Sequence, residues 1–304
     1  MTNLELKLAG WTGPSSPTEQ EKQDRTERMI REAVEAHPAF DGMSCKIYAK
    51  GSYANNTNVK ADSDVDIAVE CQDLFYWDEH TSGAHPASNG IYEGIWTPEK
   101  LRHELTIALR ARFSTLVDTS RSTAIQINSN SARVEADVVP CFSYRYYFSP
   151  TSYREGAKIF KTDGNSIVNY SALQLENGRN KNNRTNYRFK KSVRIIKRLE
   201  NAMAEEGYHQ EVSSFFIECL VYNCPDTVFQ RLTWIETVKG ILAHIYTSLE
   251  GTEPTDSENR WLEVNGAKYL FHGSQKWSRE DGRNFAYAGW NYLCLLYTSP
   301  SPRD

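Results

Sequence analysis

The sequence predicts an α/β (α+β) fold, with a small sheet and helices in the first half and a mostly helical second half. In the first half, helical patterns alternate with short apolar runs bounded by turn residues, in the order helix–strand–strand–helix–strand–strand. In the second half, apolar residues recur mainly at helical spacing. A chain of 304 residues can bury one large core or two. We expect two lobes that divide near residue 160, with an active-site cleft between them.

The first half begins with a well-marked helix. Ser16, Pro17 and Glu19 have the pattern of a capping box with proline in the first turn, and Pro38 ends the helical periodicity. Glycines and prolines indicate a loop-rich region from 72 to 97. The other elements expected here are strands at 45–53, 65–71, 124–127 and 133–139, and a helix at 97–113.

In the second half, helices are expected at 186–205, 212–222, 228–249 and 278–295. The final residues, 297–304, break every preceding pattern, so we expect a disordered or non-native tail there. The predicted organisation is therefore a strand-bearing core at 1–160, a helical lobe at 161–296, and the tail.

Composition excludes several classes of protein. The net charge of −4 argues against a general polyanion binder, and there is no run of eighteen apolar residues to cross a membrane. The N-terminus lacks the pattern of a secretory signal, and the six cysteines have no framework spacing, which favours a reducing, cytoplasmic setting. Cys219, Cys224 and His209 lack the second close pair that a zinc site needs.

Acidic residues at the start of an apolar run are the main chemical signal. Alternation along a strand places Asp62, Asp64 and Asp66 on one face and does not choose among them. Asp137 lies in a second valine-rich strand pattern. Neighbouring carboxylates are costly to keep ionised unless a cation lies between them, and Mg²⁺ prefers hard oxygen ligands shared with phosphates. Solubilising acids at a strand entrance are the alternative interpretation.

Phosphate-binding features accompany these acids. The turn at Gly51, Ser52 and Tyr53 offers backbone N–H groups and a hydroxyl that can meet a triphosphate. A basic run without acidic residues extends from Arg179 to Arg198. Such a run is often a solvated helix face, but beside a carboxylate cluster it favours a partly buried phosphate-binding helix.

The order of these motifs resembles a known family. A Gly51-Ser52 turn, Asp64-Val65-Asp66-Ile67 and a later strand Asp137 are similar to the polymerase-beta superfamily of nucleotidyltransferases. The downstream segments resemble the bacterial cGAS/DncV-like nucleotidyltransferases, the CD-NTases of anti-phage CBASS systems, and segment 167–170 resembles their clade E. Those segments are 167–170, 176–182, 189–198 and 213–218, and the similarity covers about residues 15–295. The family pattern selects Asp64 and Asp66 and leaves Asp62 in the loop.

The resemblance implies a nucleotidyltransferase catalytic core and roles for further residues. Asp64, Asp66 and Asp137 would hold two Mg²⁺ or Mn²⁺ ions and catalyse transfer. Lys197 and Ser214 would hold the donor triphosphate, with a surface lysine and an N-cap serine as the structural alternatives. Asn169 would favour uracil over adenine, although a turn-capping asparagine is equally consistent.

The function implied is synthesis of a cyclic di- or oligonucleotide messenger from NTPs (ATP, UTP or GTP), with release of pyrophosphate. The product would act on a separate effector protein. No membrane and no sequence-specific nucleic acid are expected as partners. A template-independent transferase acting on RNA, protein or a small molecule is one alternative, and a catalytically silent nucleotide-binding module is another.

Overall fold

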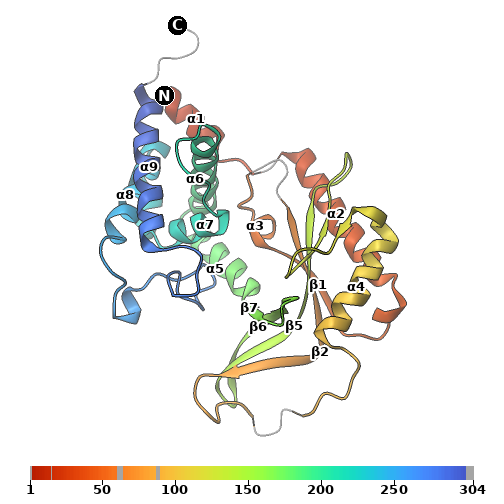
Figure 1. The fold of residues 1–304 in the computed structure, drawn as a ribbon. Coiled ribbons are helices and arrows are strands. Elements are labelled where there is room, and N and C mark those ends of the chain that lie inside the picture. Colours follow the sequence, from red (N-terminus) through yellow and green to blue (C-terminus); the bar gives the residue numbers. More distant parts are fainter. Residues whose placement is uncertain (1, 15, 60–63, 87–89, 299–304) are drawn as a thin grey trace. The chain divides into compact units, whose positions relative to one another are not determined.

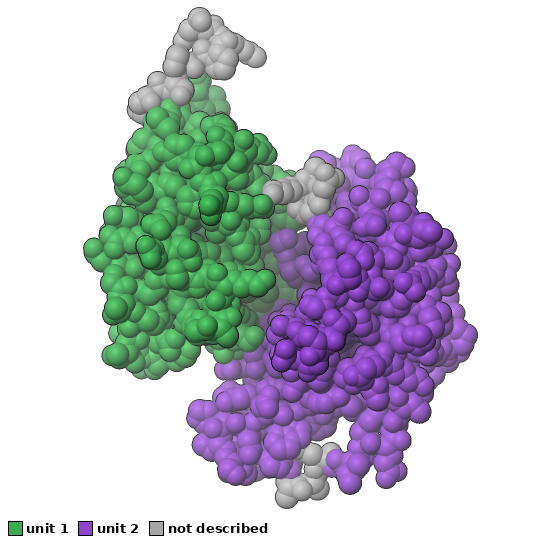
Figure 2. Space-filling view, in the orientation of Figure 1, with its two compact units in different colours: residues 1–14, 55–59, 173–304 green, residues 15–54, 60–172 purple. Residues whose placement is uncertain are grey.

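The computed structural model describes residues 2–14, 16–59, 64–86 and 90–298 (Figure 1). The chain forms two compact units, coloured separately in Figure 2. Unit 1 comprises residues 1–14, 55–59 and 173–304, and unit 2 comprises residues 15–54 and 60–172. Within the part of the chain that is described, no helix has the length and apolar character needed to cross a membrane.

Unit 2 is built on a mixed sheet. In the described residues its main path runs β1-β2-β5-β4-β3, and β6 and then β7 continue from β5. β2 lies parallel to β5, and the other pairs are antiparallel. The strands are β1 (Cys45–Lys50), β2 (Val65–Glu79), β3 (Val117–Asp118), β4 (Ile125–Ile127), β5 (Ala136–Ser149), β6 (Ser152–Phe160) and β7 (Ser166–Asn169).

Two helices of unit 2 pack against one face of this sheet. α2 (Pro17–Glu35) and α4 (Pro98–Phe113) contact each other, and their apolar sides join Ile67 and Val138 of the central strands in one buried cluster. The capping box of α2 is present, with Ser16 and Glu19 each bonding the other's backbone. Short 3₁₀ turns, η1 (Pro38–Phe40) and η2 (Ser114–Leu116), follow these helices.

Several expected boundaries in unit 2 are wrong. The strand expected at 45–53 ends at Lys50, because Gly51 has φ of +69° and begins the short helix α3 (Gly51–Ala54). The region from 72 to 79, expected as loop, continues β2 through a bulge between Cys71 and Phe75 and pairs with β5. β6 and β7 were not expected either. Their pairing depends on contacts distant in sequence, which local pattern does not reveal.

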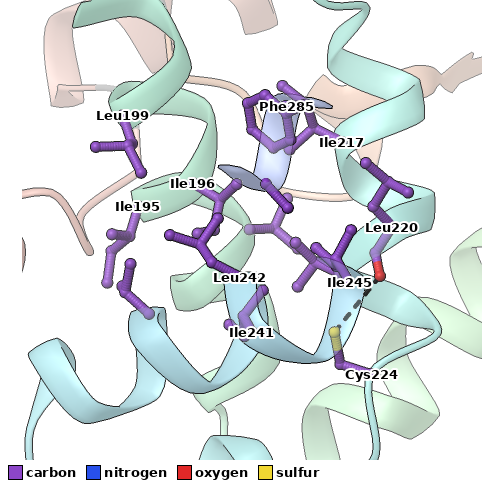
Figure 3. Close-up of a cluster of buried hydrophobic side chains, with 14 of the residues drawn as sticks. Ile195, Ile196, Leu199, Ile217, Leu220, Cys224, Ile241, Leu242, Ile245 and Phe285 are labelled. Carbon is purple, nitrogen blue, oxygen red and sulfur yellow. Dashed lines mark hydrogen bonds between the residues drawn. The ribbon is translucent and has the colours of Figure 1, made fainter. Parts of the chain in front are cut away.

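Unit 1 is helical. Its elements are α1 (Asn3–Gly10), α5 (Ser171–Arg184, which starts in unit 2), α6 (Arg188–Glu205), α7 (Ser214–Tyr222), η3 (Asp226–Gln230), α8 (Trp234–Ser248), η4 (Ser257–Asn259) and α9 (Arg279–Thr298). Figure 3 shows isoleucines and leucines of α6, α7 and α8 meeting Phe285 of α9, with the Cys224 thiol bonded to the Leu220 carbonyl. α9 includes Tyr297 and Thr298, where the tail was expected, and 299–304 lie outside the described residues.

Basic residues of α6 hold backbone segments of unit 1 in place. The Arg194 guanidinium donates to the carbonyls of Thr12 and Asn56 at 2.7 and 2.5 Å. Arg198 donates to the carbonyls of Trp11 and Gly13. These charge-assisted bonds fix the N-terminal segment and the 55–59 segment against the helix.

Candidate active site

The predicted aspartates lie at one end of the two central strands of unit 2. Asp66 and Asp137 are register partners on the parallel strands β2 and β5, and Asp64 directly precedes β2. The Val65 amide donates to the Glu135 carbonyl at 3.0 Å, which ties the starts of the two strands together. Adjacent parallel strands lie about 4.8 Å apart, so the two carboxylates share one small region.

Gly51 leaves room for the Asp66 carboxylate. Its φ is +69°, and a Cβ built there would overlap the Asp66 Oδ2 atom. Glycine therefore serves both the left-handed backbone and the close approach. The predicted turn thus meets one of the predicted aspartates within unit 2.

Burial and neighbouring negative charges raise the pKa values of Asp64 and Asp137. Burial, together with Glu135, Asp137 and Asp66, raises the pKa of Asp64 to about 6. Burial, Asp66 and Glu135 also raise the pKa of Asp137, while Arg121 opposes the shift. Asp137 Oδ1 is buried without a hydrogen-bond partner among the described atoms. An unpartnered carboxylate oxygen within an acidic cluster is suited to bind a cation.

Two cations of the described residues face the cluster. Arg121 Nη1 lies 2.6 Å from Asp137 Oδ2 and Arg121 Nη2 lies 3.3 Å from Glu135 Oε1. Lys50 Nζ lies 3.7 Å from Asp66 Oδ1. Sequence reasoning missed Glu135 and Arg121. Strand alternation signals Glu135, which stands two residues before Asp137, but the loop around Arg121 has no periodic pattern that would have revealed it.

The donor set suits a hard divalent cation, although the side chains do not converge on one as placed. Among the described residues, no three acidic, histidine or cysteine side chains are grouped closely enough to hold a metal. Carboxylate oxygens are nevertheless the ligands that Mg²⁺ and Mn²⁺ prefer, and Asp137 keeps one buried oxygen unpaired. The chemistry of this donor set therefore fits such an ion.

Lys197 and Ser214 belong to unit 1, where Lys197 is buried and Ser214 is exposed. The side chain of Lys197 is only 2% exposed, and its Nζ lies 3.5 Å from both Glu218 Oε2 and Thr57 Oγ1. Burial lowers the pKa of Lys197, and Glu218 opposes that shift. Ser214 is exposed at the first residue of α7, and Ser213 occupies the N-cap position.

Glu218 is the centre of a buried polar cluster in unit 1. Asn55 and Thr57 donate to its two carboxylate oxygens at 2.5 and 2.7 Å, and Gln174 donates at 3.4 Å. With Lys197 beside it, this acid is well partnered. The cluster ties the 55–59 segment to α6 and α7.

The remaining predicted residues lie in unit 2. The Tyr53 hydroxyl donates to Asp24 of α2 at 2.5 Å, and burial and this bond raise its pKa. Ser52 lies in α3 beside Gly51 and is half-buried. Asn169 ends β7 opposite Ala157 of β6, and a Cβ on Gly156 would crowd the Asn169 carbonyl at 2.9 Å.

Comparison with known proteins identifies the family. Residues 176–294 match the cGAS/DncV-like nucleotidyltransferase C-terminal helical domain. The chain is 36% identical over 293 residues to a cyclic dipyrimidine nucleotide synthase of Cecembia lonarensis, covering 95% of this chain and 98% of that protein. It is 33% identical over 300 residues to a cyclic dipurine nucleotide synthase of Elizabethkingia meningoseptica, covering 96% and 99%. The chain belongs to the CD-NTases.

Structural similarity agrees with this assignment. The c-UMP-AMP synthase of Rhodothermus marinus, solved with Apcpp and Upnpp, superposes with a TM-score of 0.82 at 26% identity and covers 99% of both chains. The predicted polymerase-beta-like fold is therefore confirmed. This CD-NTase is a nucleotidyltransferase that synthesises cyclic oligonucleotides from NTPs, of the kind that acts in CBASS defence.

Proposed function

We propose that this CD-NTase makes a cyclic dinucleotide that contains uridine, and that transfer takes place at Asp64, Asp66 and Asp137. The pairing of Asp66 with Asp137 on the parallel strands β2 and β5 is the observation that carries the assignment of the site. Asp64 precedes β2, and Gly51 leaves space for the Asp66 carboxylate. The product would act on a separate effector protein.

The reaction joins a ribose hydroxyl to the α-phosphate of an NTP and releases pyrophosphate. Asp64, Asp66 and Asp137 would hold Mg²⁺ or Mn²⁺, which when bound lowers the pKa of the attacking hydroxyl and stabilises charge on the phosphates. The raised pKa of Asp137 suits a carboxylate that accepts the proton of that hydroxyl. Two successive transfers close the ring.

Ser52 and Ser214 are the phosphate contacts proposed outside the acids. Ser52 follows Gly51 at the start of α3, near the Asp66 carboxylate, where a hydroxyl and backbone amides can meet phosphate. Ser214 offers an exposed hydroxyl at the first turn of α7. A triphosphate role for Lys197 stays a prediction, because its ammonium would have to leave Glu218.

Uridine is proposed from Asn169 and from the relatives together. An asparagine amide can both donate to and accept from a pyrimidine edge. Gly156 lets β6 approach the Asn169 carbonyl closely, and Asn169 pairs with Ala157 of that strand. The Cecembia lonarensis relative is a dipyrimidine synthase, and the Rhodothermus marinus structure holds Upnpp, although the Elizabethkingia meningoseptica relative is a dipurine synthase.

The test is to incubate the pure protein with labelled NTPs and Mg²⁺ or Mn²⁺, and to omit one NTP at a time. A phosphatase-resistant product that disappears without UTP supports the proposal, and persistence of that product without UTP contradicts the base assignment. Asp137→Asn should abolish the product, whereas Asp163→Asn, an exposed turn residue of unit 2, should retain it. Phosphatase-sensitive linear products would indicate a template-independent transferase, and binding without turnover would indicate a silent module.

Asn169→Ala tests the proposed base contact separately. Loss of the amide should lower incorporation of UTP relative to ATP by about tenfold, because a good pair of hydrogen bonds contributes about 1–3 kcal/mol of discrimination. Competition between labelled UTP and ATP in one reaction measures the ratio. An unchanged ratio would remove Asn169 from base selection and leave the assignment of the aspartates intact.

A further inference from the structure

Arg121 lies among the carboxylates without being part of any recognised motif. It stands in the loop between β3 and β4 and forms a close ion pair with Asp137, at 2.6 Å, and a second with Glu135, at 3.3 Å. Its side chain is 41% exposed, so the guanidinium sits at the solvent edge of the cluster. Gln126 also donates to Glu135 and holds that acid toward the arginine.

The backbone of the Arg121 loop is anchored, whereas its side chain is long and partly in solvent. Arg102 of α4 donates to the carbonyls of Thr119, Arg121 and Ala124 at 3.3, 2.7 and 3.0 Å. The Ser120 amide and hydroxyl bond the Asp118 carboxylate at 2.8 and 3.0 Å. Hydrogen bonds from α4 and within the loop therefore hold its backbone in place. The Arg121 guanidinium can still move by rotation of its own side chain.

The ion pair occupies one of the two carboxylate oxygens that Asp137 could offer to a divalent cation. Arg121 takes Asp137 Oδ2, while Asp137 Oδ1 is buried and has no partner among the described atoms. In this arrangement no three metal-type side chains of the described residues converge. The guanidinium is always positively charged, so it repels a cation that binds the same carboxylate.

We propose that Arg121 is a displaceable counter-ion of the active site. Arg121 offsets the charges of Asp137 and Glu135 before a divalent cation binds, and its guanidinium would move away from Asp137 once these acids hold a cation. The inference rests on the proposed metal role of the aspartates. The two ion pairs place one positive charge between neighbouring carboxylates, where it offsets part of their repulsion.

Binding of Mn²⁺ to the protein without nucleotide tests this directly. Arg121→Gln should bind Mn²⁺ about tenfold or more tightly than the unaltered protein, because a competing charge within a few Å of the ion is removed. Arg121→Lys keeps the charge and should stay close to the unaltered protein. Arg112→Gln is the matched control, since Arg112 forms a similarly exposed ion pair with Glu32 on α2 instead. Titration followed by electron paramagnetic resonance at mildly alkaline pH, where the carboxyls are ionised, gives the affinities.

Chemical labelling provides a second readout that does not depend on a substitution. Phenylglyoxal modifies free guanidinium groups, and peptide mass spectrometry reports the modified position. Mn²⁺ should increase labelling of Arg121 several-fold and leave that of Arg112 unchanged. Unchanged labelling of Arg121 at saturating Mn²⁺ would overturn the proposal, because the ion pair would then persist beside the metal.

The outcomes separate this inference from the proposed function. Equal or weaker Mn²⁺ binding by Arg121→Gln, with clear binding by the unaltered protein, overturns the counter-ion role alone. Absence of Mn²⁺ binding in both proteins overturns the metal assignment and the inference with it. Binding that is lost in Asp137→Asn and strengthened in Arg121→Gln supports both.

Discussion

Each unit contains a cluster of charged side chains, and the two clusters differ in how completely their charges are paired. In unit 2, among the described residues, acids outnumber the facing cations at the starts of β2 and β5, the pKa values of Asp64 and Asp137 are raised, and one oxygen of Asp137 is unpaired. In unit 1, Glu218 is buried, with partners at both carboxylate oxygens and Lys197 beside it. Unbalanced charge near solvent is suited to binding a ligand, whereas balanced and buried charge is suited to holding the fold.

The largest effect is expected for Asp64→Asn. Product formation should fall by about 10³-fold, because removing one preorganised electrostatic group commonly costs that much. The fold should become more stable above pH 6. The pKa of Asp64 is raised from 3.8 to about 6, so the ionised acid destabilises the folded state, and stability decreases as pH rises through that window.

Turnover assays and thermal unfolding at several pH values measure both effects of Asp64→Asn. The gain in stability should be absent near the unfolded-state pKa of 3.8 and complete above about pH 6. Asp163→Asn, in an exposed turn, should change neither the activity nor the slope of stability with pH above 6. If Asp64→Asn instead lost stability at neutral pH, Asp64 would support the fold. The two clusters would then no longer differ in their roles.

The next largest effect is expected for the buried ion pair between Lys197 and Glu218. Glu218→Gln keeps the shape but leaves the Lys197 ammonium unpaired in the interior, so unfolding free energy should fall by about 3 kcal/mol. Lys197→Met combined with Glu218→Gln should recover most of that loss, because no buried charge remains. Urea denaturation gives the values.

A surface pair provides the control for Glu218. Glu250 is 71% exposed and pairs with Arg283, so Glu250→Gln should lower the free energy of unfolding by less than about 1 kcal/mol.

If Lys197→Met instead abolished turnover with little loss of stability, Lys197 would be a phosphate ligand and not a structural partner of Glu218. That result would support the prediction made from the sequence.

Local signals in the sequence predicted part of this molecule. The capping box of α2 and the strand patterns that carry Asp66 and Asp137 follow from signals within a few residues. The strand period of two also indicates Glu135, which stands two residues before Asp137. These features were predictable because each depends on local spacing or alternation.

The rest depends on tertiary contacts. The extension of β2 to Glu79 depends on pairing with β5 across a bulge, and the residues involved are too polar to show clear alternation. Arg121 reaches Asp137 because Arg102 anchors its loop, which no spacing reveals. The pairing of Lys197 with Glu218 could not be predicted either, because the basic run favours a partly buried helix without showing which side chain its lysine meets.

A smaller effect is expected at Gly51. Gly51→Ala and Gly164→Ala both place alanine at positive φ, +69° and +84°, so each should lose about 1 kcal/mol of stability. Only at Gly51 does the added Cβ meet a neighbour, the Asp66 carboxylate, whereas nothing lies within 4 Å at Gly164. Turnover should therefore fall only in Gly51→Ala, and equal turnover in both variants would show that the position of the Asp66 carboxylate is not critical.

The smallest effect tests whether other acids of unit 1 are also structural. Glu5 of α1 accepts from the amides of Trp234 and Ile235 at 2.7 and 3.0 Å, at the positive end of α8. Glu5→Gln should lower the stability by about 0.5–1 kcal/mol without changing turnover, because one charged acceptor becomes a neutral amide. Urea unfolding and the turnover assay measure the two quantities. The matched control Glu236→Gln alters the capping box of the same helix at an exposed site, where solvent screens the charge, so its cost should be smaller. A Glu5 variant that loses turnover while keeping its stability would show that balanced charge in unit 1 also serves catalysis, and the division of roles between the two clusters would fail.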